Sequence, residues 1–298
     1  MAEMVKKATR ESYGEALKEL ADQYPQVVVL DADLAEATKT GIFKKAYPDR
    51  FIDCGIAECD MVGVAAGLAT CGKIPFATSF AMFSTGRAYE QVRNSVGYPH
   101  LNVKIVGSHA GISVGEDGAT HQCNEDIALM RTIPGMVVLN PSDHYEMKAA
   151  VKAAIEHHGP VYIRLGRLAV ESFNNADDYK FELGKGITLK DGKDITIIAT
   201  GLMVSRALEA VKTLAEQGID ARLINIHTIK PIDREIIVKA AQETGKIITV
   251  EEHNVIGGLG DAVCSVLSEE CPTPVMKIGV NDVFGHSGPA QDLLDEFG

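Results

Sequence analysis

Short runs rich in β-branched residues alternate with helical segments along the whole sequence. The strand-like runs include residues 27–33, 74–79 and 103–108, and amphipathic or apolar helical stretches separate them. Parallel strands need a crossover connection of a dozen or more residues, which is usually a helix. The alternation therefore predicts an α/β fold with mainly parallel sheets.

The periodicity also gives the extent of each element. Residues 9–21 should form the first helix, because Tyr13, Ala16, Leu17 and Leu20 recur at helical spacing on one face. We expect further helices at 58–70, 87–96, 124–130, 142–156, 204–217, 234–243 and 258–269, and further strands at 136–141, 161–165, 195–201, 221–227, 246–252 and 274–280.

The pattern breaks once, between Gly166 and Gly192, in a polar stretch rich in Asn and Asp that is followed by the glycines of GKG. Such a stretch is typical of a linker. A chain of 298 residues is long enough for about two domains. We therefore predict two domains, 1–185 and 186–298, each a mainly parallel sheet flanked by helices.

Charge and hydropathy exclude several classes of function. The formal net charge is −12, which disfavours a protein that binds nucleic-acid backbones. The longest uncharged stretches, 61–72 and 74–86, are shorter than the roughly 18 residues that a membrane span needs. The first residues carry two lysines but no apolar block behind them. We expect a cytoplasmic protein.

Six cysteines occur without any CxxC pair, so we interpret them as small buried apolar side chains and predict no metal site in this chain. The glycine patterns that cradle dinucleotides or nucleotide phosphates are also absent from the sequence. We interpret the nearest glycine-rich segment, 257–263, as a tight entry into a helix.

One carboxylate stands out because of its position. Glu58 begins an otherwise apolar helix after the strand-like segment FIDCGIA. It could interact favourably with the helix dipole, or it could be a carboxyl group in a dry pocket that donates or relays a proton. Phe80 and Phe83 follow at a strand-to-helix junction, where they could pack in the core or present a ring face to a heteroaromatic ligand.

A glycine-punctuated loop at 108–122 concentrates His109, Glu116, Asp117 and His121 just after a strand. Loops at the ends of strands bind ligands in α/β sheets, although a solvated polar loop would have the same composition. Arg10, Arg164 and Arg167 could bind an anion or form structural salt bridges.

Taken together, the segments resemble the C-terminal half of transketolases. The matching pieces cover nearly the whole chain and run in order: ATR (8–10), DADL (31–34), GIAE (55–58), SFAMF (79–83), SHAGISVGEDGATHQ (108–122), IRLGR (163–167), TVEEH (249–253) and FGHSG (284–288). GEDGATHQ is the most specific piece, because related thiamine diphosphate enzymes share strings like GIAE.

The resemblance implies a pyrimidine-binding domain followed by the family's C-terminal domain. It implies that Glu58 hydrogen-bonds the aminopyrimidine ring of thiamine diphosphate, that Phe83 stacks on this ring with Phe80 close by, and that Asp33 lies near the thiazolium. It further implies that His109, Asp117 and His121 contact the sugar substrate and that Arg10 and Arg164 contact its phosphate. On this basis we expect Glu58, His109 and His121 to be the catalytic residues.

The sequence departs from the family pattern at two site positions and lacks one motif. Ala37 stands where a phosphate-contacting serine is usual, although Thr38 and Thr40 are nearby, and Cys59 replaces a histidine. No GDG triplet occurs in the sequence, whereas full-length transketolases use a GDG-to-Asn motif to hold the diphosphate through a divalent metal. The chain therefore resembles one half of a split enzyme.

We expect a transketolase subunit of the pentose phosphate pathway that transfers a two-carbon ketol unit between sugar phosphates. The partner would be an N-terminal diphosphate-binding subunit in an α2β2 heterotetramer, and this partner would provide the Mg²⁺ ligands. Two alternatives remain open. One is a subunit like deoxyxylulose phosphate synthase or the β subunit of a 2-oxo-acid dehydrogenase, and the other is a non-catalytic scaffold.

Overall fold

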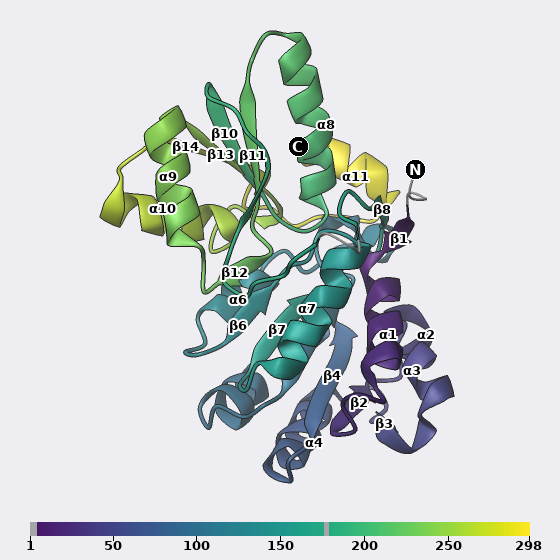
Figure 1. Ribbon diagram of the computed structural model, residues 1–298. Helices are drawn as coiled ribbons and strands as arrows, with labels where there is room; N and C mark the ends of the chain where they lie inside the picture. The colour runs from purple at the N-terminus through teal and green to yellow at the C-terminus, as the bar shows by residue number, and fades with distance from the viewer. Residues whose placement is uncertain (1–4, 176–178) are drawn as a thin grey trace.

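The structure is a computed structural model that describes residues 5–175 and 179–298 (Figure 1). The strands are β1 (Lys6–Ala8), β2 (Val27–Asp31), β3 (Phe51–Asp53), β4 (Ile74–Phe80), β5 (Lys104–Ser108), β6 (Val137–Leu139), β7 (Val161–Arg164), β8 (Ala169–Glu171), β9 (Ile187–Lys190), β10 (Ile195–Ala199), β11 (Ala221–Asn225), β12 (Thr228–Lys230), β13 (Ile247–Asn254) and β14 (Val275–Val280).

The α-helices are α1 (Thr9–Leu20), α2 (Ala35–Thr38), α3 (Gly41–Ala46), α4 (Glu58–Thr70), α5 (Tyr89–Gln91), α6 (Asp126–Arg131), α7 (His144–Glu156), α8 (Met203–Glu216), α9 (Arg234–Thr244), α10 (Leu259–Glu270) and α11 (Ala290–Glu296). Four further helical segments of other types are η1 (Pro48–Arg50), η2 (Met82–Arg87), η3 (Val92–Gly97) and η4 (Ile112–Asp117). None of the helices among the described residues has the length and apolar character that a membrane crossing needs.

Two mainly parallel sheets confirm the predicted fold class. The larger sheet has the strand order β12-β6-β7-β5-β4-β2-β3 and the smaller one β14-β13-β10-β11-β9, while β1 and β8 pair separately. Only β12 and β9 run antiparallel to their neighbours in these two sheets. In the larger sheet β2 lies between β3 and β4. The chain places β3 on one side of β2 and then crosses to place β4 on the other side, so the order in which strands are added changes direction at β2. Such a switch point is where open α/β sheets bind ligands.

The strand predicted at 221–227 is wrong at its end. β11 stops at Asn225, and the next residues form β12, which pairs antiparallel with β6 of the larger sheet. Lys230 of β12 also donates from Nζ to the carbonyls of Arg131 (2.8 Å) and Ile133 (2.6 Å). The C-terminal half thus contributes a strand to the sheet of the N-terminal half.

The helix predicted at 87–96 begins earlier, at Met82, and contains two segments with the wider π-type turn, η2 and η3. The hydroxyls of Ser84 and Thr85 donate to the carbonyls of Phe80 (3.1 Å) and Ala81 (2.6 Å). These side-chain bonds compete with the regular helical ladder, and π-type turns occur frequently at functional sites.

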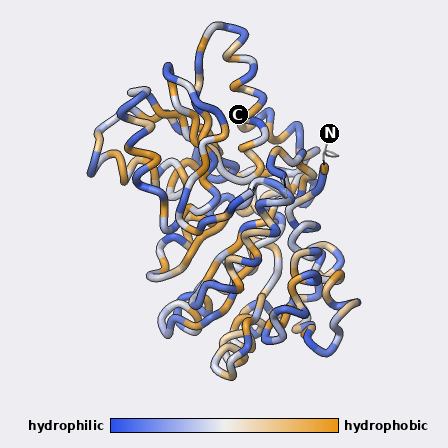
Figure 2. Tube along the Cα trace, in the orientation of Figure 1, coloured by the Kyte–Doolittle hydropathy of each residue, from blue (hydrophilic) through white to orange (hydrophobic). Residues whose placement is uncertain are grey.

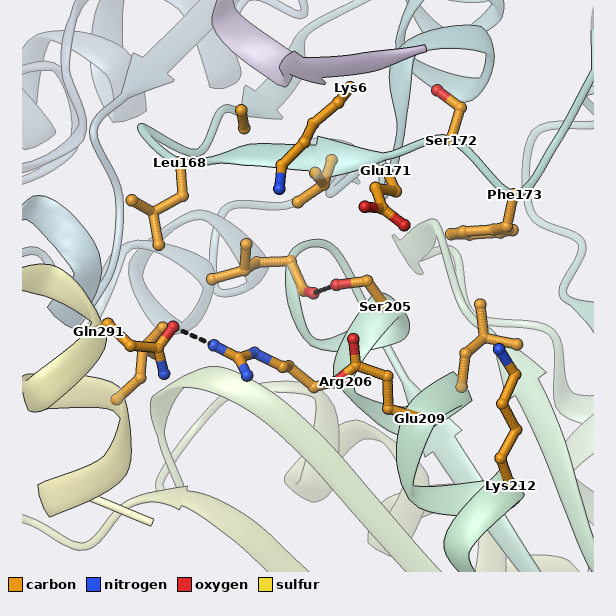
Figure 3. A pocket seen from close by; sticks show the side chains of 15 residues that line it. Lys6, Leu168, Glu171, Ser172, Phe173, Ser205, Arg206, Glu209, Lys212 and Gln291 are labelled. Atoms are coloured by element: carbon orange, nitrogen blue, oxygen red, sulfur yellow. Dashed lines mark hydrogen bonds between the residues drawn. The ribbon is translucent and has the colours of Figure 1, made fainter. Parts of the chain in front are cut away.

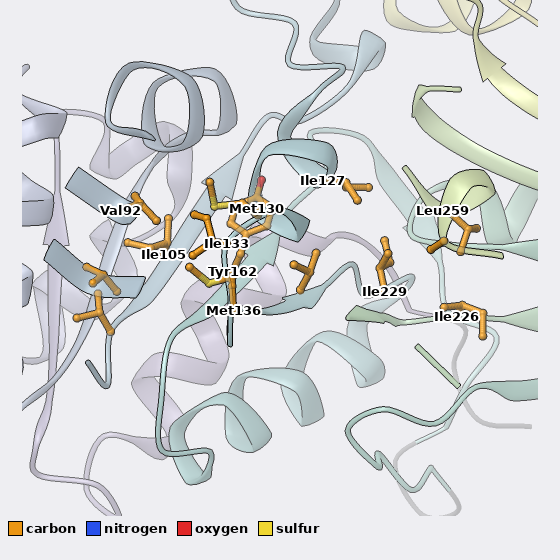
Figure 4. Packing of buried hydrophobic residues seen from close by; sticks show 14 of the residues in the cluster. Val92, Ile105, Ile127, Met130, Ile133, Met136, Tyr162, Ile226, Ile229 and Leu259 are labelled. Carbon is orange, nitrogen blue, oxygen red and sulfur yellow. The ribbon is translucent and has the colours of Figure 1, made fainter. Parts of the chain in front are cut away.

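The largest hydrophobic cluster extends across both halves (Figure 4). It joins Ile105, Met130 and Tyr162 of the larger sheet and its helices to Ile226 and Leu259 of the C-terminal half. Figure 2 shows hydrophobic residues along the strands of both sheets, with mixed hydropathy on the helices that cover them. Shared burial of this kind makes the two halves stabilise each other.

The glycine-rich segment before α10 is a tight helix entry, as predicted. The backbone N–H groups of Leu259 and Gly260 donate to the buried carboxyl of Glu251 at 2.6 and 2.8 Å. A Cβ atom at Gly258 would lie 1.9 Å from that carboxyl, so only glycine fits there.

The interpretation of the cysteines holds only in part. All six are free thiols, but only Cys123 is buried, and Cys71 is exposed. The others are partly buried, and Cys54, Cys59 and Cys271 pack against the largest hydrophobic cluster.

Ile229 in β12 offers a test of the shared core, because it is 1% exposed. Ile229→Ala should lower the free energy of unfolding by about 2–5 kcal/mol, the usual cost of truncating a buried isoleucine. Unfolding should remain one transition that is followed equally by signals from both halves. Ile219→Ala, at an exposed position, should cost far less. Two separate transitions, with only one of them shifted, would contradict a shared core.

Candidate functional site

Four of the predicted site residues lie at the carboxyl edge of the larger sheet. Asp33 follows β2, Glu58 follows β3, Phe80 ends β4 and His109 follows β5. Parallel strands bring these carboxyl ends to the same edge, so residues far apart in sequence become neighbours there.

Glu58 lies in the first turn of α4 and is only 1% exposed. Its two carboxylate oxygens have different partners. Oε2 accepts from Nη1 of Arg87 at 2.8 Å, and Oε1 accepts from the hydroxyl of Ser79 at a longer 3.3 Å. A buried carboxyl group without partners would be costly, and these two contacts offset that cost.

Four ring side chains form a cluster beside Glu58, and all four were predicted as site residues. Phe80 stacks on His109 with 4.0 Å between ring centroids and lies 6.2 Å from Phe83 in a stacked arrangement. The rings of His121 and Phe83 are nearly perpendicular, with 5.2 Å between their centroids. The site therefore has an aromatic wall that could receive a flat heterocycle.

His109 has a fixed tautomer. Nη1 of Arg10 lies 3.3 Å from its Nε2, and because a guanidinium only donates, Nε2 is the acceptor. The ring proton is then on Nδ1 and points to the hydroxyl of Ser108 at 2.9 Å. Burial, together with the nearby cations Arg10 and Arg167, lowers the pKa of His109 to about 3. The imidazole is therefore neutral at physiological pH.

Cationic side chains surround this histidine. Arg10 also donates to the carbonyl of Ala37 at 2.7 Å, and its buried Nε has no hydrogen-bond partner among the described residues. Arg167 donates to the carbonyl of Val114 and to the carboxylate of Glu116. The charge of Lys39 also acts on His109. Together, Arg10, Arg167 and Lys39 could bind an anion. No pattern in the sequence identifies Lys39 as a member of this group.

Arg164 lies apart from this group, in the interior. Its Nε donates to the carboxylate of Asp126 at 2.8 Å, and Nη2 donates to the carbonyl of Glu252 at 2.7 Å. Both side chains of the Arg164–Asp126 pair are buried. The sequence left open whether Arg164 binds an anion or forms a structural salt bridge, and the structure shows the salt bridge. A contact between Arg164 and a phosphate stays a prediction.

Asp33 and Asp117 lie at the exposed rim of the site. Asp33 has a left-handed backbone with φ 62°, and its N–H donates to the carboxylate of Asp53 at 3.1 Å. The buried carboxyl group in this region is instead Asp31, which accepts from the hydroxyls of Thr38 and Thr40, both at 2.8 Å. Burial raises the pKa of Asp31. The hydroxyls of Thr38 and Thr40 are thus already bonded to Asp31 within the protein.

Sequence reasoning gave Arg87 no role in the site, and the structure places it there. Besides its bond to Glu58, its guanidinium carbon lies 4.4 Å from the centroid of the Phe83 ring. Nothing in the local sequence could reveal this pair, because Glu58 and Arg87 are 29 residues apart and meet only in the folded sheet.

A separate cavity of about 530 Å³ lies between β8, α8 and α11 (Figure 3). Lys6, Glu171, Arg206, Glu209 and Lys212 line it, and Arg206 bonds to Gln291 (Figure 3). None of the predicted site residues belongs to this lining.

The electrostatic description of His109 can be tested by NMR titration. The imidazole should stay neutral from pH 8 down to about pH 5, because its folded pKa is about 3. Arg10→Gln should raise this pKa, since it removes one of the cations that lower it. Exposed His286, whose pKa is raised by its bond to Glu296, is the internal control. A midpoint for His109 near 6.5 would contradict the buried, cation-flanked geometry.

Comparison with known proteins matches two family descriptions in sequence order. Residues 5–172 match the transketolase pyrimidine binding domain, and residues 184–298 match the transketolase C-terminal domain. Among curated relatives, a Methanocaldococcus jannaschii protein named as a transketolase C-terminal section is 52% identical over 99% of this chain and 93% of its own length. The 6-deoxy-6-sulfo-D-fructose transketolase subunit SqwH of a Clostridium species is 46% identical over 97% of this chain and 89% of its own.

A solved structure gives the same result. A split-gene transketolase described as an inactive β4 tetramer has 56% sequence identity and a TM-score of 0.92 over 98% of this chain and 94% of that one.

Proposed function

The chain belongs to the transketolase family, and we propose that it is the C-terminal subunit of a two-subunit transketolase that moves a two-carbon ketol unit from a ketose phosphate to an aldose phosphate. The observation that carries this proposal is the position of Glu58, a buried carboxyl group beside an aromatic wall at the switch point of the sheet. The names of the relatives favour a transketolase over a synthase or dehydrogenase subunit.

The residues of this chain fit the ring half of thiamine diphosphate. Oε1 of Glu58 has only a 3.3 Å contact with Ser79, so it could also meet a ring nitrogen. Phe83 is only partly buried and could lie against the ring face, with Phe80 behind it. When bound, thiamine diphosphate supplies the electron sink that lets a carbon–carbon bond beside a carbonyl break and form.

In this proposal each site residue holds a proton, contacts the sugar or lies beside the cofactor. Glu58 holds the proton at the ring nitrogen opposite the amino group. His109 is neutral and Ser108 holds its Nδ1, so Nε2 would accept from a sugar hydroxyl in place of its 3.3 Å contact with Arg10. His121 and Asp117 contact the sugar from the loop that contains η4, and Asp33 lies on the thiazolium side.

The anionic end of the substrate would meet Arg10, with Arg167 and Lys39 close by. The relative SqwH is named for a sulfonated ketose, so an anionic group at the end of the sugar is common to both kinds of substrate. A planar guanidinium suits the oxygens of phosphate and sulfonate equally.

The partner should be an N-terminal subunit that holds the diphosphate through Mg²⁺, in an α2β2 heterotetramer. The proposal rests on the split-gene relatives and on the absence of a GDG triplet in the sequence. We place the reaction in pentose phosphate interconversion. The split-gene structure described as an inactive β4 tetramer supports this dependence, because that assembly contains β chains alone.

The arginines can be separated by their effects on KM and stability. Arg10→Ala should raise KM for a phosphorylated donor by a factor of about 10 to 150, the loss of a charge-assisted hydrogen bond of roughly 1.5–3 kcal/mol. Arg164→Ala should cost about 3–5 kcal/mol of stability, because it leaves Asp126 buried without its cation. If Arg164 also contacts the phosphate, its KM rises as well.

Arg167→Ala is the matched comparison, since its ion pair with Glu116 is largely exposed and its loss should change stability far less than the loss of the Arg164 pair. A normal KM for folded Arg164→Ala would leave that residue its structural role alone. A normal KM for Arg10→Ala would overturn the proposed anion site.

Glu58→Gln should slow exchange of the cofactor's C2 proton by at least about 10²-fold, because an amide keeps the shape but cannot relay a proton. The rate is followed by NMR in deuterated water on the assembled enzyme, whose assembly should be unchanged. Exchange at the wild-type rate with cofactor bound would reduce Glu58 to a helix-terminal carboxylate.

Reconstitution tests the function as a whole. The lone chain, supplied with thiamine diphosphate and Mg²⁺, should show no ketol transfer, and addition of the N-terminal subunit should restore it. Full turnover by the lone chain would refute the split-enzyme proposal. A reconstituted complex that binds no thiamine diphosphate would leave only a scaffold role.

A further inference from the structure

We propose that Arg87 is a positioning residue that fixes the carboxyl group of Glu58 for its work on the aminopyrimidine ring, an inference that rests on the proposed function. It acts through Glu58 and Phe83, the two residues expected to meet the ring.

The contacts show how Arg87 reaches both residues. Its Nη1 lies 2.8 Å from Oε2 of Glu58, and its guanidinium carbon lies 4.4 Å from the centroid of Phe83. The backbone is held as well, because the thiol of Cys59 is 3.5 Å from the carbonyl of Arg87. One side chain thus links the start of α4 to the aromatic wall.

The pair is asymmetric, and the asymmetry sets the orientation of the carboxyl group. Glu58 is 1% exposed, whereas the Arg87 side chain is 49% exposed and reaches inward from the surface. Oε2 is held by the short bond to Arg87, while Oε1 has only the longer contact with Ser79. The carboxyl group is therefore fixed by one oxygen and presents the other to a ligand.

The π-type turn of η2 places Phe83 and Arg87 together. The N–H of Ala88 donates to the carbonyl of Phe83 at 3.2 Å, five residues back, instead of the usual four. This wider turn brings the side chain of Arg87 over the ring of Phe83 while its end reaches Glu58.

A guanidinium is suited to this double contact in a way that an ammonium is not. Its plane can lie against an aromatic face while its N–H groups point at a carboxylate. Lysine would keep the charge but lose the fixed fork of donors. The Arg87→Lys variant should therefore position the carboxyl group of Glu58 only in part.

The test is a double-mutant cycle on the reconstituted complex with thiamine diphosphate. Arg87→Gln should slow C2 proton exchange about tenfold, within the range that a misplaced catalytic group costs. In the Glu58→Gln background the same change should cause no further slowing, because Arg87 acts through Glu58. Arg87→Lys should lie between Arg87→Gln and wild type. Arg93→Gln, a matched change at an exposed position in η3, should exchange at the wild-type rate.

A second readout uses the lone chain without cofactor. The decreases in Tm caused by Glu58→Gln and Arg87→Gln should not add in the double variant, because both remove the same contact. Additive decreases would show that the ion pair is not formed.

The outcomes separate this inference from the proposed function. If the wild-type complex neither binds thiamine diphosphate nor exchanges its C2 proton, both fail. If the wild-type complex exchanges normally but Arg87→Gln does so at the same rate, only the role of Arg87 is overturned. An equal slowing in the Glu58→Gln background would also overturn it, since Arg87 would then act independently of Glu58.

Discussion

A buried ion pair between Arg164 and Asp126 lies where the two halves of the chain meet, and the arrangement of the site depends on it. Asp126 also accepts from the hydroxyl of Tyr162 at 2.6 Å, and Arg164 bonds to the backbone of Glu252 in β13. The carboxylate of Glu252 in turn accepts from the N–H of Ser113 at 2.7 Å, at the start of η4. These bonds offset part of the cost of withdrawing the pair from water, although Oδ1 of Asp126 and Oε2 of Glu252 are buried without a hydrogen-bond partner among the described residues. The loop with Asp117 and His121 is therefore tied to the C-terminal half.

The site combines an aromatic wall with cations, although the protein is acidic. The net charge is −12, yet Arg10, Lys39 and Arg167 all act on His109 at one edge of the sheet. Cations grouped beside buried apolar side chains strengthen the local field and favour an anionic ligand there. Because burial and the nearby cations keep His109 neutral, its ring does not add to the positive charge. The geometry suits a polyhydroxylated substrate with an anionic end.

Much of this arrangement could be predicted from the sequence. The alternation of strands and helices predicts the parallel sheets, and the start of α4 at Glu58 follows from local pattern alone. Phe80, Phe83, His109 and His121 were predicted as site residues. They lie together because Phe80 and Phe83 stand at the end of β4 and just after it, while His109 and His121 follow the adjacent parallel strand β5. Other features depend on contacts that form only in the folded chain. β12 has three residues and exists because β6 accepts it as a partner, and the partners of Arg87 and Arg164 are distant in sequence. The boundary between 185 and 186 stays a prediction.

The central claim is that the carboxyl group of Glu58 meets the aminopyrimidine ring of thiamine diphosphate. The most direct measurement is an experimental structure of the reconstituted two-chain complex with thiamine diphosphate and Mg²⁺. The account predicts that an oxygen of Glu58 lies within hydrogen-bond distance, about 2.6–3.2 Å, of the ring nitrogen opposite the amino group, with Phe83 against the ring face. A ring bound elsewhere, with Glu58 still paired only to Arg87 and Ser79, would contradict it.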